Sequence, residues 1–112
     1  MANYIKNKEL REEIIVCLEA DELTPKAIDM FYLLVTHFGW NLKYKNPEDR
    51  KDCESQAMMD LYMYWRNYNP KYPNAFAYFT QLTKNGFAKG WRTIHPHKEI
   101  HISLSHGTIH SI

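Results

Sequence analysis

Apolar residues recur at three- and four-residue steps along most of the chain, which is the period of an amphipathic helix. The first such segment covers about residues 7–19. The second begins at Thr24 and Pro25, a helix N-cap followed by proline at the first helical position, and Gly39 is expected to end it. The predicted inward positions of these two helices are Leu10, Ile14, Cys17 and Leu18, then Ala27, Met30, Phe31, Leu34 and Phe38.

Two further helices are predicted, over about residues 47–68 and 74–92. Asn46 and Pro47 repeat the start signal, and Asp49 lies in the first turn, where a carboxylate favours the helix dipole. The prolines within 67–73 must separate the two helices. The predicted inward stripes are Cys53, Ala57, Leu61, Tyr64 or Trp65, and Tyr68, then Phe76, Phe79, Thr83, Phe87 and Trp91.

Two glycines, Gly86 and Gly90, lie within the fourth predicted helix. Each weakens a helix by roughly 1 kcal/mol relative to alanine. Glycine at such positions indicates either close packing against a neighbouring helix or a frayed helix end.

These elements predict an all-α fold, a compact bundle of about four helices over residues 1–98. Residues 99–112 alternate apolar and polar side chains, as a short strand or an extended docking peptide would. At 112 residues the chain is long enough to bury one core without metal or disulfide help. We therefore expect one helical domain followed by a short extended tail.

Composition limits the class of protein further. The uncharged segments are too short and polar to span a membrane, and the N-terminus lacks the apolar stretch of a signal peptide. We therefore expect no membrane association and a cytoplasmic location. Cys17 and Cys53 show no CxxC spacing and are expected to be reduced.

Charge is distributed unevenly along the chain. Residues 1–60 hold eight Lys/Arg and twelve Asp/Glu, whereas residues 61–98 hold six Lys/Arg, ten aromatic rings and no Asp or Glu. A surface that is both basic and aromatic can neutralise phosphates and stack unpaired bases. The alternative is that most of these rings are core and the lysines form an ordinary solvated face.

The helical period of the fourth predicted helix indicates which of its residues lie in the core and which are available to bind nucleic acid. Its buried stripe leaves Tyr78, Gln81, Lys84, Asn85, Lys89 and Arg92 outside the predicted core. Tyr72, in the connection before the helix, is also not an obvious core residue. For Tyr78 the alternative is packing in the core beside Phe79.

Catalytic and metal-binding motifs are not recognisable in the sequence. There is no Gly-rich phosphate loop, no HExxH and no nucleophile with an attendant base. Five of the six histidines lie in 95–110, but their spacing matches no familiar zinc finger. We expect no enzymatic activity and no cofactor; a small enzyme or metal-binding protein that uses the histidine tail is the alternative, which metal analysis would test.

One segment carries a family resemblance: "DCESQAMMDLYMYWRNYNPKYPNAFAYFTQLTKNGFAKGWRTI", residues 52–94, resembles region 2 of bacterial sigma factors. The phrases "KYPNAFAYFTQ" and "NYIKNKEL" are most similar to the late-transcription sigma factors of T-even-type bacteriophages. The resemblance covers about 90 of the 112 residues. It implies a polymerase-binding helix, a short turn and a promoter-melting helix.

The resemblance also implies partners and site residues. The third helix would dock on the beta-prime clamp helices of bacterial core RNA polymerase, and the residues facing the polymerase would be Asp52, Ser55, Gln56, Met59 and Tyr62. The fourth helix would bind the non-template strand of an A/T-rich −10 promoter element. Its DNA-binding residues, with those of the preceding turn, would be Tyr72, Asn74, Tyr78, Gln81, Lys84, Asn85, Lys89 and Arg92, with Tyr78 as the base-stacking tyrosine.

The chain also departs from the family. Gln81 and Leu82 stand where primary sigma factors carry a tryptophan pair, and the 112 residues predict no second helix-turn-helix domain. The tail lacks the acidic and aromatic residues of the late factors' sliding-clamp peptide, so dependence on a sliding clamp or co-activator stays open. The alternative function is a helical regulator, an anti-sigma or polymerase-appropriation protein, that binds polymerase without contacting DNA.

Overall fold

The computed structural model describes residues 5–40 and 46–95 of the chain, and these residues form an all-α fold. The helices are α1 (Asn7–Ala20), α2 (Pro25–Trp40), α3 (Pro47–Tyr64) and α4 (Ala75–Ile94), with a short 3-10 helix, η1 (Trp65–Asn67), after α3. The predicted fold class and the order of four helices are confirmed. The expected extended tail, 99–112, lies outside the described residues.

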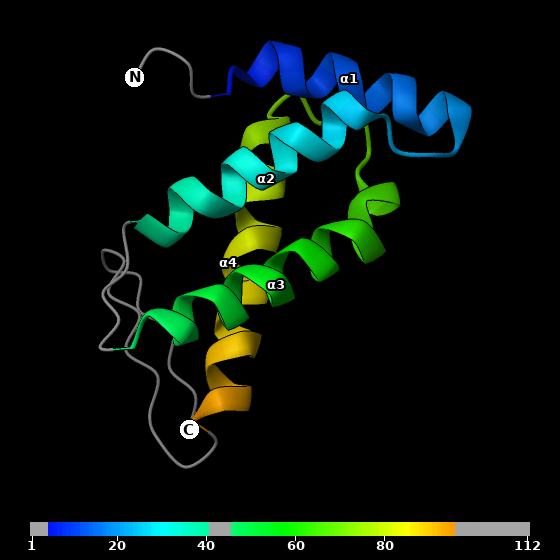
Figure 1. Cartoon of the computed structure of the whole chain (residues 1–112). Coiled ribbons are helices and arrows are strands. Elements are labelled where there is room, and N and C mark those ends of the chain that lie inside the picture. The colour runs from blue at the N-terminus through cyan, green and yellow to red at the C-terminus, as the bar shows by residue number, and fades with distance from the viewer. Residues whose placement is uncertain (1–4, 41–45, 96–112) are drawn as a thin grey trace.

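Figure 1 shows α1 across the top of the molecule, with α2 and α3 below it and α4 crossing behind them. The most extensive helix pair is α3 with α4, and α4 also contacts α1 and α2. Because α4 lies against all three other helices, its inward stripe is central to the core. None of the helices in the described part combines the length and apolar composition that a bilayer crossing requires.

Side-chain caps explain where three helices begin. Thr24 Oγ1 accepts from Ala27 N–H at 3.1 Å, and Asn46 Oδ1 accepts from Glu48 N–H at 3.0 Å. Asn74 Oδ1 accepts from the amide of the third residue of α4, also at 3.0 Å. Each cap satisfies a backbone donor that has no partner inside its helix.

The core contains most of the positions that the hydrophobic period predicted, whereas Leu18, Phe38, Phe76 and Trp91 are only partly buried and pack against it. Fully buried side chains include Leu10, Ile14, Phe31, Leu34, Leu61, Trp65, Phe79 and Phe87. Of the two alternatives at the end of the third stripe, Trp65 is buried and Tyr64 is exposed. Cys17 and Cys53 are both buried and form no disulfide with each other.

Two predicted helix ends are wrong. Gly39 lies within α2, which ends one residue later at Trp40, and a Cβ at position 39 would lie 2.8 Å from Glu54 Oε2 of α3. The third helix ends at Tyr64 instead of Tyr68, since the chain tightens into η1 before it reaches Asn69 and Pro70.

The glycines of α4 mark a close approach of two backbones. A Cβ on Gly86 would lie 2.5 Å from Ala57 Cα, and one on Gly90 would lie 2.9 Å from Cys53 Cα. Both distances are shorter than a carbon–carbon contact allows. Of the two explanations open from the sequence, close packing against a neighbouring helix is confirmed.

Candidate functional site

The outer side of α4 brings together most of the predicted DNA-binding residues. At about 100° per residue, Tyr78, Gln81, Asn85, Lys89 and Arg92 lie within roughly 40° of a common direction. Gln81 Nε2 donates to Asn85 Oδ1 at 3.0 Å, which links two of them one turn apart. We call these five residues the outer face of α4.

Lys84 is the member of the predicted set that the helix separates from the others. It lies roughly 100° around α4 from the centre of the outer face. Its side chain is partly buried, whereas Gln81, Asn85 and Arg92 are exposed. A single strand bound along the outer face would therefore not reach Lys84 as it reaches the other five residues.

Tyr78 is neither a free ring nor a fully buried one. Its ring centroid lies 5.3 Å from that of Tyr68 and 5.0 Å from that of Phe79. Burial raises the pKa of the Tyr78 phenol above its ordinary value. Because the ring is partly buried, it is held in place on one side while part of it can still contact a ligand.

Lys89 has a partner that the sequence did not reveal. Its ammonium nitrogen lies 3.1 Å from each carboxylate oxygen of Asp60, whose side chain is 3% exposed. Gln56 Nε2 also donates to this carboxylate, at 3.0 Å. Lys89 thus neutralises the buried negative charge of Asp60 on α3. Only part of the positive charge of Lys89 therefore remains available to attract a phosphate.

The turn before α4 carries the other two predicted DNA-binding residues. Tyr72 is 63% exposed, and its backbone oxygen accepts from the hydroxyl of Tyr68. Asn74 caps α4 with its side chain, so its amide oxygen is already occupied. The exposed Lys71 lies directly before Tyr72 and adds a cation to this turn.

The outer face of α3 contains the residues predicted to face the polymerase. Asp52, Ser55, Met59 and Tyr62 are exposed, while Gln56 is partly buried because it reaches Asp60. The apolar members are large and open: Met59 is 54% exposed, Tyr62 57% and the neighbouring Met63 60%. These exposed apolar side chains are more typical of a contact surface than of a solvated one.

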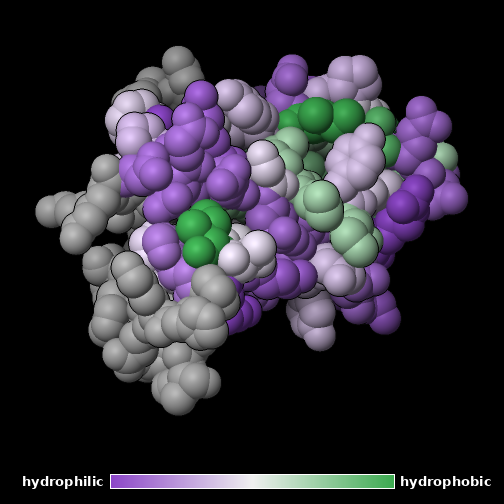
Figure 2. Space-filling view, turned by 60° about the horizontal axis from the view of Figure 1, so that its bottom comes forward, coloured by the Kyte–Doolittle hydropathy of each residue, from purple (hydrophilic) through white to green (hydrophobic). Residues whose placement is uncertain are grey.

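The face of the molecule shown in Figure 2 is not uniformly apolar. Hydrophilic residues cover most of the face shown in Figure 2, and hydrophobic residues gather in separate areas of it. Gathered apolar residues with a polar surround are typical of sites that contact another molecule.

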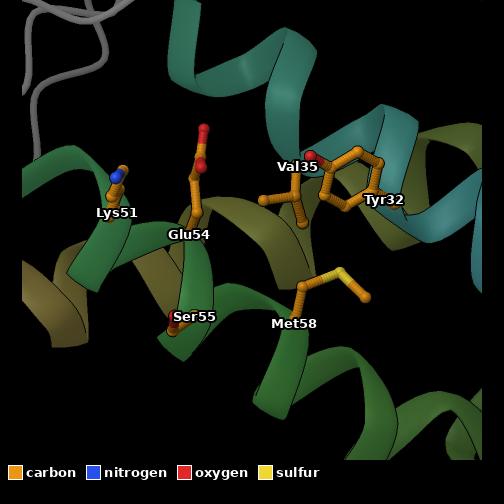
Figure 3. A pocket seen from close by; sticks show the side chains of 6 residues that line it. All are labelled: Tyr32, Val35, Lys51, Glu54, Ser55 and Met58. Atoms are coloured by element: carbon orange, nitrogen blue, oxygen red, sulfur yellow. The ribbon is translucent and has the colours of Figure 1, made fainter.

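A groove lies between α2 and α3. Its volume is about 430 Å³, and its lining residues are Tyr32, Val35, Lys51, Glu54, Ser55 and Met58. Figure 3 shows Tyr32 and Val35 entering from α2 opposite Met58 from α3. No histidine accompanies Ser55 in this lining, and no three His, Cys, Asp or Glu side chains among the described residues could hold a metal ion together.

The sequence reasoning missed Asp60 and Lys71. Asp60 follows Cys53 by seven residues and Ala57 by three, so it falls within the inward stripe of α3. An acidic residue in a core stripe requires a buried partner, and this was the signal available. Lys71 gave no periodic signal because it lies in a turn.

Comparisons of the chain with protein-family models, with curated proteins and with solved structures find no match.

Proposed function

We propose that the chain is a sigma-like transcription initiation factor. In this proposal the outer face of α3 binds the beta-prime clamp helices of bacterial core RNA polymerase. The outer face of α4 binds the non-template strand of an A/T-rich −10-like promoter element as the duplex opens. The resemblance of residues 52–94 to sigma region 2 supports this assignment of roles.

The observation that carries the proposal is the composition of the outer face of α4. It joins a firmly packed tyrosine, two amides and two cations, and α4 contains no Asp or Glu. Tyr72 adds an exposed ring in the turn before the helix. Aromatic rings accept unpaired bases and cations accept phosphates, which is the combination used for single strands.

The energetics of opening fit a binding mechanism without hydrolysis. Moving a base out of the duplex costs a few kcal/mol, and stacking on a ring returns roughly 1–3 kcal/mol. A·T-rich steps, TA above all, unstack most easily, so capture of single-stranded bases favours A/T-rich elements. The protein would thus select a promoter by stabilising its opened form.

Run-off transcription tests the proposal. Core polymerase is assayed with and without the protein on two templates that differ only in an A/T-rich or G/C-rich −10 element. We expect a protein-dependent transcript from the A/T-rich template, with permanganate-reactive thymines in that element. The proposal would be refuted by equal amounts of transcript from the two templates. It would also be refuted if the protein gave no transcript and did not bind the polymerase.

Variants of Tyr78 sharpen this test. Tyr78→Ala removes a stacking surface worth roughly 1–3 kcal/mol, so opening should fall by one to two orders of magnitude. Tyr78→Phe keeps the ring and is the matched control, with opening close to the original level. A folded Tyr78→Ala protein that opens the promoter normally would exclude base capture by this residue.

A polymerase-binding regulator that does not contact DNA is the second candidate. The ion pair between Lys89 and Asp60 favours it, since this pair reduces the charge available to phosphates on α4. The double variant Lys71→Gln, Arg92→Gln, which removes the exposed cations of the proposed DNA-binding surface, separates the two candidates. Unchanged binding of the polymerase complex to promoter DNA would favour the regulator.

A further inference from the structure

We propose that Asn7 and Arg11 of α1 are positioning residues that hold the 68–74 loop and the start of α4 in the conformation that binds nucleic acid. This inference rests on the proposed function of α4. It gives the N-terminal helix a role in DNA binding although α1 contains none of the residues expected to touch DNA.

Asn7 and Arg11 make three hydrogen bonds to the 68–74 loop and the start of α4. We call these three contacts within the protein the clamp. Asn7 Nδ2 donates to the carbonyl of Pro73 at 3.0 Å, and Asn7 Oδ1 accepts from Phe76 N–H at 2.8 Å. Arg11 Nη2 donates to the carbonyl of Pro70 at 2.7 Å. Asn7 and Arg11 are one turn apart on α1, so one helix face reaches both ends of the loop.

The rest of the loop is held from within. Asn69 accepts from Tyr72 N–H through its carbonyl at 2.9 Å and from Lys71 N–H through its side chain at 2.9 Å. The Tyr68 hydroxyl donates to the carbonyl of Tyr72. Together with the α1 contacts, the carbonyls of residues 69, 70, 72 and 73 each have a hydrogen-bond donor.

Such an arrangement is unusual for a surface turn, because loops generally leave much of their backbone to water. At its tip it presents an exposed cation and an exposed ring, Lys71 and Tyr72. Fixing a binding loop before the ligand arrives lowers the ordering cost of binding. The same contacts fix the first turn of α4, which carries Tyr78.

Two substitutions and one control test the clamp. Asn7→Ala removes both of its hydrogen bonds, and Arg11→Gln removes the contact to Pro70. Lys8→Gln is the matched control, since it makes the same charge change with the same replacement at an exposed position of the same turn. Circular dichroism at the assay temperature confirms that all three proteins are folded.

Trypsin provides a readout that does not depend on DNA. Lys71 is the only Lys or Arg in the 68–74 loop, so cleavage after it reports how often the loop opens. We expect cleavage at Lys71 to be at least about fivefold faster in Asn7→Ala and Arg11→Gln, and unchanged in Lys8→Gln. Equal cleavage rates in all proteins would overturn the clamp.

DNA binding is measured on the complex with core polymerase, using a fork probe with an A/T-rich single-stranded −10 segment. If the released loop spends about a tenth of its time in the binding conformation, the apparent Kd rises about tenfold. The affinity for core polymerase should not change. A general loss of structure would instead weaken polymerase binding as well. Fork binding equal to the original in both variants overturns the inference alone, whereas no fork binding by the unaltered protein overturns the proposed function with it.

Discussion

Replacement of Lys89 by alanine should destabilise the fold, because Lys89 neutralises the buried carboxylate of Asp60. Hydrogen bonds to charged groups contribute roughly 1.5–3 kcal/mol. The Lys89 side chain is 44% exposed, so water replaces part of what is lost, and Gln56 still donates to the carboxylate. We therefore expect a loss of about 1–2 kcal/mol in the free energy of unfolding.

A double-mutant cycle measures this interaction directly. The cycle compares Lys89→Ala, Asp60→Asn and the double variant by urea unfolding, followed by circular dichroism. Asp60→Asn keeps the shape of the side chain and removes its charge, so Lys89→Ala should cost less in this background, with an interaction energy of about 1 kcal/mol. For a domain of this size, the single variant should melt roughly 5–15 °C lower.

Arg92→Ala is the control for this cycle, since Arg92 lies on the same outer face and is exposed. Its stability should change by less than about 0.5 kcal/mol, whereas it should lower the salt dependence of single-strand binding by about 0.7 in slope. Lys89→Ala should lower this slope by less, because its charge is shared with Asp60. An interaction energy near zero, or Lys89→Ala melting like Arg92→Ala, would refute the structural role of the pair.

Three further predictions test other parts of the structure. Because the pKa of Tyr78 is raised in the folded protein, the unfolded chain loses the phenol proton at a lower pH than the folded chain does. The free energy of unfolding should therefore fall as pH rises above about 10. Urea titrations at about pH 9–11.5 measure this fall, and Tyr78→Phe should remove the part of it that Tyr78 causes. Gly86→Ala should destabilise by roughly 1–3 kcal/mol because its Cβ meets the α3 backbone. Gly39→Ala should be neutral or stabilising, because its close contact is with the movable carboxylate of Glu54 and its contacts with Phe87 and Arg50 are ordinary; equal melting temperatures of the two variants would contradict this. Asp52→Lys should abolish co-purification with core polymerase and leave the melting temperature unchanged, while Gln56→Ala should also cost about 1 kcal/mol of stability through its lost hydrogen bond.

The helices could be predicted because each one carries its own pattern and start signal. The apolar period placed Leu10, Phe31, Leu61 and Phe87 in the core, and the N-caps are local contacts within three residues. The ends were less predictable. Gly39 lies within the last turn of α2 and faces Glu54 of α3, and no local pattern contains this information.

The sequence predicted which side of the helix the candidate site residues lie on, but not which residues they contact. Helical spacing correctly separated the outer side of α4 from its core, yet it could not show that Lys89 pairs with a carboxylate 29 positions earlier in the chain. The clamp on the 68–74 loop joins Asn7 to Phe76 across 69 positions. Such contacts depend on how the helices cross, which is determined by packing at positions such as Gly86.

The partial neutralisation of Lys89 changes the expected balance of forces in DNA binding. Lys71, next to Tyr72, and Arg92, on the outer face of α4, remain as exposed cations, while Lys84 lies on another side of α4. Two phosphate contacts give a salt slope of only about 1.4 for a single strand, whereas each stacked base contributes roughly 1–3 kcal/mol. Stacking should thus dominate, and a surface of this kind binds duplex DNA weakly because paired bases do not expose their faces. Under the proposed function, recognition therefore depends on the polymerase to bring the opened strand to α4, and the outer faces of α3 and α4 are proposed to act together.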